Sequence, residues 1–151
     1  MKCHVGVDAG TGYAHTMEAT SANVHDVTVT SERIREDDEA VYGDSGYLGI
    51  EKREEAVQNE HLSSVDCRIN LRPGRFPKVS DNAIDWTRQI EKRQSSVCSK
   101  AEHIFRIIKC QFGYRKVRYR GLKKNENRLY AMFACANLYL LAMAGRKLQE
   151  A

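Results

Sequence analysis

The chain has 151 residues, of which 42% are hydrophobic and 29% are charged, with ten glycines and two prolines. This composition excludes a disordered low-complexity chain and a collagen-like chain, and the length favours one domain over residues 1–151 with a buried core. The five cysteines are odd in number and include no C-x-x-C pair, which excludes a disulfide framework and a zinc knuckle as expectations.

The net charge of +4 is divided unequally along the chain. Residues 1–70 carry 6 Lys and Arg against 14 Asp and Glu, a net of −8, whereas residues 71–151 carry 18 against 6, a net of +12. A basic half is expected of a protein that contacts nucleic-acid phosphates, although it also fits a solvated helix face. Six cations stand close together: Arg115, Lys116, Arg118, Arg120, Lys123 and Lys124. Val117, Tyr119 and Leu122 are interleaved with them, as in a surface that follows a strand and stacks on its bases.

Residues 1–10 lack the basic and apolar regions of a secretory signal, so a cytoplasmic protein is expected.

The first predicted elements are two strands. Residues 3–8 and 14–20 alternate apolar with small or polar side chains around a turn at 11–12, which predicts a β-hairpin. Residues 21–36 begin with capping residues and are β-branched in the middle, so they form a helix, which we favour, or a third strand.

The middle of the chain predicts a βα unit and a further strand. Residues 39–43 form a short apolar strand that ends at Asp44, and a charged helix is expected from about 49 to 60. Residues 65–71 predict the next strand, which is followed by a basic loop containing both prolines.

Two long helices are predicted after that loop. Residues from about 83 to 111 contain neither Gly nor Pro and are stopped by Gly113, so they form one helix or two with a break near 95–96. A final apolar helix is expected from about 125 to 147. Its apolar stretch, Leu129–Ala144, is shorter than the ~18–20 residues of a membrane-spanning helix, which predicts a core helix and no membrane partner. The succession of strands and helices predicts an α/β fold.

Three carboxylates stand out by their positions. Asp8 ends one predicted strand, Asp44 ends another, and Glu102 lies on the first long helix. Ligands gather at the carboxyl ends of strands in an α/β sheet, so these three side chains could converge. Converged carboxylates repel one another unless a cation neutralises them, which would indicate Mg²⁺ or Mn²⁺. Each acid taken alone fits a solvated carboxylate or a helix cap better, and spacing alone does not single out these three among twenty acids.

The helix around Glu102 has two predicted faces. An apolar stripe is expected to be buried: Ala101, Phe105, Ile108 and Phe112. Glu102, Arg106 and Lys109 share the adjacent face. Arg106 and Lys109 are therefore candidates for contacting a phosphate, whereas the spacing of Glu102 and Arg106 also fits an ordinary i,i+4 ion pair.

Three segments resemble blocks of one family in the same order. They read HVGVDAGTGYAHTMEATSANVHD, VYGDSGYLG and KAEHIFRIIKCQFGYRKVRYRGLKKN. The chain resembles the catalytic part of bacterial insertion-sequence transposases of the DDE type, specifically the IS-five group of the IS-four-like superfamily. The likeness covers nearly the whole chain, and each block contains one of the three acids.

The resemblance implies an RNase-H-like fold, in which helices flank a mixed sheet. It implies that Asp8, Asp44 and Glu102 are catalytic and hold two Mg²⁺ or Mn²⁺ ions, and that the domain cleaves a DNA strand and joins it to target DNA. The implied partners are transposon ends, target DNA and a second copy in a homodimer, in a nucleoid-associated protein. The family's lysine with six residues intervening after the glutamate is matched by Lys109.

The sequence departs from the family in two respects. Cys98 stands where the family has an arginine before the glutamate, and a thiol cannot supply the hydrogen bonds of a guanidinium. The chain also starts seven residues before Asp8, where relatives carry a further region that recognises the terminal repeats. Both features predict a truncated copy with impaired activity.

Two alternatives belong to other functional classes. The first is a non-catalytic DNA-binding fragment, in which the basic half binds DNA and the acidic site is vestigial. The second is a nucleotide kinase, because the D-A-G-T-G turn at residues 8–12 also occurs in sugar kinases and actin. The chain lacks the third glycine of G-x-G-x-x-G and a following Walker lysine, which disfavours the kinase.

Overall fold

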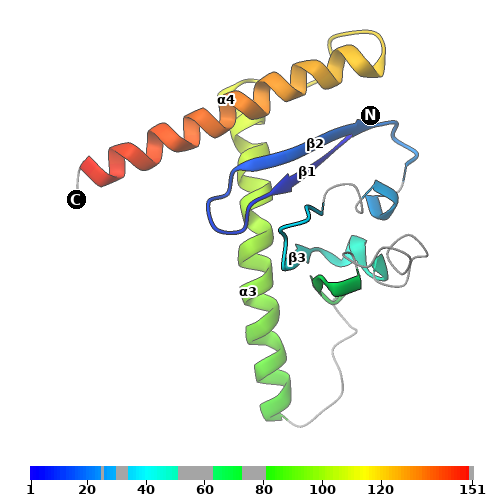
Figure 1. Ribbon diagram of the computed structural model, residues 1–151, viewed down its shortest axis with the longest axis vertical. Coiled ribbons are helices and arrows are strands. Elements are labelled where there is room, and N and C mark those ends of the chain that lie inside the picture. Colours follow the sequence, from blue (N-terminus) through cyan, green and yellow to red (C-terminus); the bar gives the residue numbers. More distant parts are fainter. Residues whose placement is uncertain (25, 30–33, 51–62, 73–80, 150–151) are drawn as a thin grey trace. The chain divides into compact units, whose positions relative to one another are not determined.

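The computed structural model describes residues 1–24, 26–29, 34–50, 63–72 and 81–149 (Figure 1). The chain divides into two compact units. One consists of Met1–Val24 with Lys100–Ala151, and the other of His25–Ser99. Helix α3, Asp81–Arg106, contributes residues to both units.

The first unit contains the predicted hairpin. Strands β1 (Lys2–Val7) and β2 (Ala14–Thr20) pair antiparallel, from Lys2 opposite Thr20 to Val7 opposite Ala14. The register shifts between Gly6 and Val7, so the end of β1 that leads into Asp8 is irregular. The structure confirms the hairpin expected from the alternation of side chains.

The hairpin packs against helix α4, Leu122–Gln149, and Figure 1 shows β2 lying alongside that helix. The buried core of this unit takes residues from three segments of the chain: Met17, Ala19, Ile104, Ile107, Ile108, Leu129, Phe133 and Ala136. Asn137 of α4 also bonds both backbone groups of Ala14, through Nδ2 to the carbonyl at 2.8 Å and through Oδ1 from the amide at 2.9 Å. The core and this amide pair fix the hairpin on α4.

The expectation of a core helix holds for one face of α4 only. Leu129, Phe133 and Ala136 are buried on one face, but Leu138 and Leu141 are 65% and 57% exposed on another. The helix is also longer than its apolar stretch. Leu122–Arg146 is long and apolar enough to cross a membrane, with a mean hydropathy of 1.2 and 17% of the window buried. One such helix is weak support for a membrane span, because core helices of soluble proteins pass the same test.

Helix α3 is continuous through residues 95–96, which settles the choice between one helix and two. It passes directly into a π-helical turn, η5, Ile107–Gln111, where the amide of Phe112 donates to the carbonyl of Ile107 at 3.1 Å. The wider turn shifts the helical phase. The most buried side chains of this segment are Ile104, Ile107 and Ile108, at 0%, 3% and 1% exposure, which is the i, i+3, i+4 spacing of one helical face.

The predicted apolar stripe is thus correct only in part. Ile108 is fully buried, whereas Ala101, Phe105 and Phe112 are half-buried. Ile104 and Ile107 replace them because the core of this unit lies between the hairpin and α4. Gly113, at φ 64°, ends the segment as expected.

The second unit contains the other pair of strands. Strands β3 (Ala40–Gly43) and β4 (Asp66–Ile69) pair parallel, with Ala40 opposite Asp66 and Gly43 opposite Ile69. Two short 3-10 helices accompany them, η1 (Asp26–Val29) and η3 (Ser45–Tyr47). The amide of Leu71 donates to the carboxylate of Glu91 at 3.1 Å, which joins the end of β4 to α3. The structure therefore confirms the strands predicted at residues 39–43 and 65–71.

Four further expectations are met only in part or lie mostly outside the described residues. The described residues within 21–36 contain the 3-10 turn η1 and otherwise turns and bends, so neither the favoured long helix nor a strand is found there. The charged helix predicted for 49–60 and the loop with both prolines lie mostly outside the described residues. The described strands form two two-stranded sheets, which fits an α/β fold, whereas the single mixed sheet of an RNase-H-like fold stays a prediction.

Candidate active site

Asp8 leaves β1 in a tight turn that fixes its carboxylate. Oδ1 accepts hydrogen bonds from the amide and the hydroxyl of Thr11, at 2.5 and 2.6 Å. The amide of Gly12 donates to the carbonyl of Asp8 at 2.8 Å, and the amide of Asp8 donates to the carbonyl of Tyr13 at 2.9 Å. Gly12 has φ 79°, a conformation that favours glycine. The turn therefore sets the orientation of a carboxylate at the end of a strand.

Lys100 of α3 holds the same turn from outside. Its Nζ donates to the carbonyl of Gly10 at 2.9 Å and also to the carbonyl of Ala9. These residues are about ninety positions apart in the sequence, so the contact is tertiary. The ammonium group ties the Asp8 turn to the helix that carries Glu102, within one unit.

Glu102, Arg106 and Lys109 lie together on the exposed face of the helix, as the spacing predicted. Glu102 follows Lys100 by two residues, or roughly 200° around an α-helix. Lys100 contacts the turn after Asp8, and the approach of Glu102 to the Asp8 carboxylate stays a prediction. Lys109 lies 5.9 Å from the centroid of the Phe105 ring, in a cation–π arrangement.

Asp44 belongs to the other unit, where it directly follows β3. Its Oδ1 accepts a hydrogen bond from the amide of Gly46 at 2.8 Å and so caps η3. The carboxylate is exposed and oriented by this bond. Asp44 thus occupies the strand end predicted for it, and at the same time it acts as a cap.

A permanent cation lies on the same pair of strands as Asp44. Arg68 bonds Asp66 through Nε at 2.7 Å and the hydroxyl of Tyr42 through Nη1 at 2.5 Å, and it stacks 5.4 Å from the Tyr42 ring centroid. The hydrogen bond to Asp66 raises the pKa of Arg68 above its ordinary value, with Tyr42 adding to the effect. Arg68 therefore carries its positive charge at neutral pH.

The carboxylates suit a divalent cation by their chemistry. Carboxylate oxygens are the ligands that Mg²⁺ and Mn²⁺ prefer, and Asp8 and Asp44 both follow strand ends. In the part of the chain that the structure describes, no group of three or more His, Cys, Asp or Glu side chains is placed to hold a metal ion. The convergence of Asp8, Asp44 and Glu102 therefore stays a prediction, and so do their catalytic roles.

A family model described as the transposase DDE domain matches residues 1–138. The chain belongs to the DDE transposase family. No solved structure matches it. The matched residues include Asp8, Asp44 and Glu102, and they take in most of the first unit and the whole of the second. This result confirms the family-level resemblance and indicates a role in DNA transposition, in a family whose members typically use divalent metals and act on DNA.

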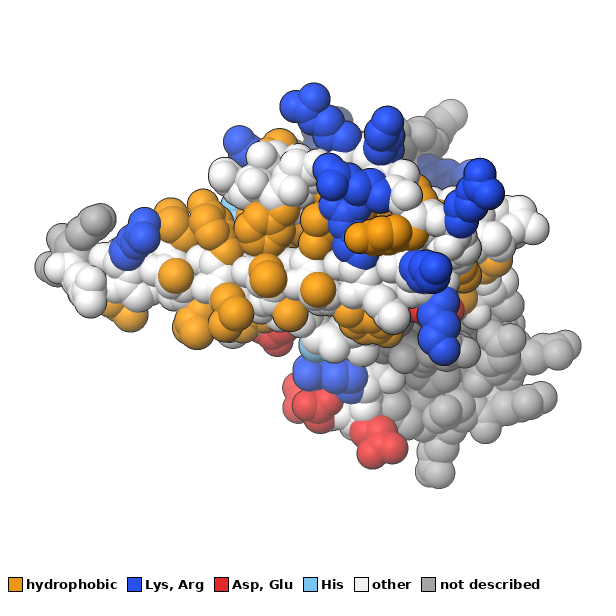
Figure 2. Space-filling model, turned by 90° about the horizontal axis from the view of Figure 1, so that it is seen from above, with side chains coloured by type: hydrophobic (Ala, Val, Ile, Leu, Met, Phe, Trp, Pro, Cys, Tyr) orange, Lys and Arg blue, Asp and Glu red, His pale blue; other side chains and the backbone are white. Residues whose placement is uncertain are grey.

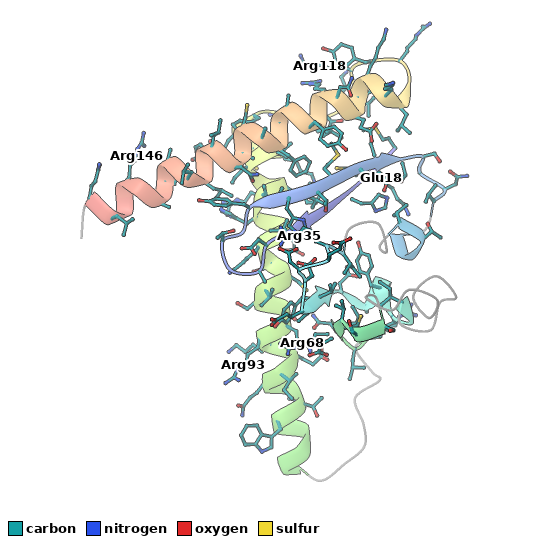
Figure 3. All side chains as sticks on the ribbon, in the orientation of Figure 1. Glu18, Arg35, Arg68, Arg93, Arg118 and Arg146 are labelled. Carbon is teal, nitrogen blue, oxygen red and sulfur yellow. The ribbon has the colours of Figure 1, made fainter. Side chains whose placement is uncertain are left out.

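The basic segment of this DDE transposase domain is exposed as expected. All six cations of residues 115–124 are exposed, and Val117, Tyr119 and Leu122 between them are 46%, 51% and 43% exposed. Figure 2 shows Lys and Arg side chains gathered at one end of the molecule's upper face, with hydrophobic side chains along the rest of α4. Figure 3 labels Arg118 beside the first turns of α4 and Arg146 near its other end. DNA binding by these side chains remains a prediction.

Sequence patterns alone missed four residues that organise the transposase domain. Thr11 and Lys100 orient the Asp8 turn, and Asn125 and Arg128 hold the basic segment. The sequence could have indicated Asn125, because it is a polar residue at the predicted start of the apolar helix, where capping residues are expected. Lys100 carried none, because a single lysine on a charged helix is ordinary.

Proposed function

We propose that this chain is the catalytic domain of an insertion-sequence transposase of the IS-five group, which cleaves a DNA strand and transfers it to target DNA. The observation that carries the proposal is the family match over residues 1–138, which contains all three predicted acids in order. An RNase-H-like arrangement, in which both compact units form one domain, is part of the proposal. The strand ends at Asp8 and Asp44 support it.

In this proposal Asp8, Asp44 and Glu102 bind two Mg²⁺ or Mn²⁺ ions. Such ions, when bound, stabilise the attacking and leaving oxygens of an in-line phosphoryl transfer. The Thr11 hydrogen bonds keep the Asp8 carboxylate oriented towards one side of the turn. Arg106 and Lys109, exposed beside Glu102, contact phosphates of the strand. Cys98 supplies no such contact, so we expect activity below that of relatives with an arginine there.

Metal binding tests the proposal without knowledge of the DNA sequence. We expect calorimetry to detect Mn²⁺ binding by the wild-type chain, and Asp44→Ala to weaken it more than ~tenfold because one metal ligand is removed. Asp37→Ala is the matched control, since Asp37 is an aspartate of the same unit whose side chain is 75% exposed and forms an ion pair with the exposed Arg35. Equal affinity in the wild type and Asp44→Ala would contradict the proposed site.

A second candidate function is non-catalytic DNA binding with a vestigial acidic site. It is favoured by the contrast between the exposed basic segment and the absence of a three-ligand group among the described residues. Metal dependence separates the two functions. Phosphate contacts persist in EDTA and weaken with salt, whereas strand cleavage requires the ion. Cleavage of a nicked or blunt duplex in Mg²⁺ but not in EDTA would exclude the second candidate.

We further propose that the chain acts as a homodimer on DNA. The exposed face of α4 supports a contact with a second copy, because Leu138, Leu141 and Leu148 are 65%, 57% and 82% exposed at spacings of three and seven residues. A leucine row of this kind is rarely left in water on a stable helix. Sedimentation velocity over a range of chain concentrations tests the dimer.

A further inference from the structure

The loop between η5 and α4, residues 113–121, is held in place by one buried asparagine. Asn125 is 2% exposed in the first turns of α4. Its Nδ2 donates to the carbonyls of Tyr119 and Gly121, at 2.7 and 2.6 Å, and its Oδ1 accepts from the amide of Tyr119 at 3.1 Å. A buried amide with three such bonds fixes the backbone that it contacts.

Arg128, one helical turn further along, forms a second contact with the same loop. Its guanidinium lies 5.3 Å from the ring centroid of Tyr114 and 6.0 Å from that of Tyr119. No described residue accepts a hydrogen bond from its buried Nη1. The guanidinium is therefore held mainly by the two ring faces, and it holds the rings in return. Asn125 fixes the backbone of the loop, while Arg128 fixes its aromatic side chains.

The consequence is a loop with a fixed backbone and exposed cations. Arg115, Lys116, Arg118 and Arg120 all extend into solvent from it. Gly121, at φ 89°, closes the loop in a conformation that favours glycine. Lys123 and Lys124 continue the charge into the first turn of α4, where the amino end of the helix dipole adds to the positive potential. The loop and the first turn of α4 together present one basic surface.

We propose that Asn125 is a positioning residue, which holds this loop as a preformed binding element for the phosphate backbone of DNA. Binding to a loop that is already ordered avoids the entropy cost of fixing several long side chains on one strand. Single-stranded and duplex DNA both present phosphates to such a surface. The six cations are spread over a loop and the start of a helix, which fits the closely spaced phosphates of a duplex better. The inference rests on the proposed function, because it takes DNA as the occupant.

The central test compares two asparagines of α4. Asn125→Asp replaces both donations to the loop with repulsion between a carboxylate and two carbonyls. Asn127→Asp makes the same change of chemistry and charge at an exposed position two residues away. We expect Asn125→Asp to bind a short duplex about tenfold more weakly than Asn127→Asp, measured by fluorescence anisotropy.

The salt dependence of that binding reports the mechanism. The slope of log affinity against log salt should fall in Asn125→Asp by about 0.9 for each phosphate that the loop no longer neutralises, and it should not fall in Asn127→Asp beyond the effect of one charge. Asn137→Asp is the control for stability alone, since it replaces the donation to the Ala14 carbonyl with repulsion and leaves the loop untouched. It should lower the melting temperature and change the slope by no more than Asn127→Asp does.

A glycine pair keeps the test valid if Asn125→Asp fails to fold. Gly121→Ala strains the closing residue of the loop without changing charge, whereas Gly145→Ala has open space around it on an exposed part of α4 and no positive φ. Gly121→Ala should weaken DNA binding and lower the slope, and Gly145→Ala should leave both unchanged. Equal slopes in all loop variants and controls would overturn the positioning role.

Limited trypsin digestion separates this inference from the proposed function. Released from Asn125, the loop should be cut faster after its own arginines and lysine in Asn125→Asp than in Asn127→Asp, with no DNA present. Faster cutting without any DNA binding by the wild type would refute the DNA-binding element and the proposed function together. DNA binding with unchanged cutting and slope would refute the role of Asn125 alone.

Discussion

At the scale of single residues, the clearest feature is the turn that carries Asp8. Thr11 orients the carboxylate from within the turn, and Lys100 bonds two of its carbonyls from α3. The carboxylate was predictable as a candidate because it follows an alternating strand. The lysine was not, because its role depends on a contact across ninety residues of chain.

Lys100→Met should loosen this turn. Removal of a charge-assisted bond to two carbonyls at a partly exposed site is expected to lower the free energy of unfolding by about 1 kcal/mol. Urea denaturation measures that change, and Mn²⁺ calorimetry should show weaker binding as well. Lys124→Met removes the same charge from an exposed position and is the control. If the two variants are equally stable and bind Mn²⁺ alike, Lys100 does not hold the turn.

At the scale of elements, α4 is the helix that organises the first unit. One of its faces packs against β2 and the π-helical turn, and another lies in solvent. Its sequence is apolar on both faces, so periodicity could place a helix there but could not say which face is buried. The choice is made by the core residues of the hairpin and of α3, which Leu129 and Phe133 contact.

Matched leucine truncations test that assignment. Leu129 is 3% exposed and Leu138 is 65% exposed on the same helix. Leu129→Ala should lower the free energy of unfolding by about 2–5 kcal/mol through reduced apolar burial and a cavity, whereas Leu138→Ala should change it by less than about 0.5 kcal/mol. Chemical denaturation at a chain concentration below any self-association measures both. A large loss of stability from Leu138→Ala under those conditions would mean that its face is buried in the monomer.

At the scale of the whole molecule, the main feature is the division of charge between the two halves of the chain. The half with a net charge of +12 includes the basic loop, whose cations remain exposed after folding. A surface of this kind binds polyanions by releasing counterions, so its affinity depends steeply on salt.

Arg118→Ala combined with Arg120→Ala should therefore reduce the salt slope of duplex binding by about 1.8 if each arginine contacts one phosphate. Arg88→Ala combined with Arg93→Ala removes two exposed arginines from α3 instead and is the control. Anisotropy titrations between low and moderate salt measure the slopes. Equal slopes for the two double variants would show that the basic loop has no special part in binding.

The amino-acid sequence by itself determined the hairpin, the strand before Asp44, the strand that begins near residue 65, the two long helices and the basic segment. These features follow from local alternation, helix period and charge, which act between residues close in the chain. Only the tertiary structure decided that Ile104 and Ile107 replace Phe105 and Phe112 in the core, that Lys100 faces Asp8, and that Asn125 holds the basic loop. The first of these depends on where the hairpin and α4 pack against the helix, and the others on hydrogen bonds to particular backbone carbonyls, for which no residue pattern codes.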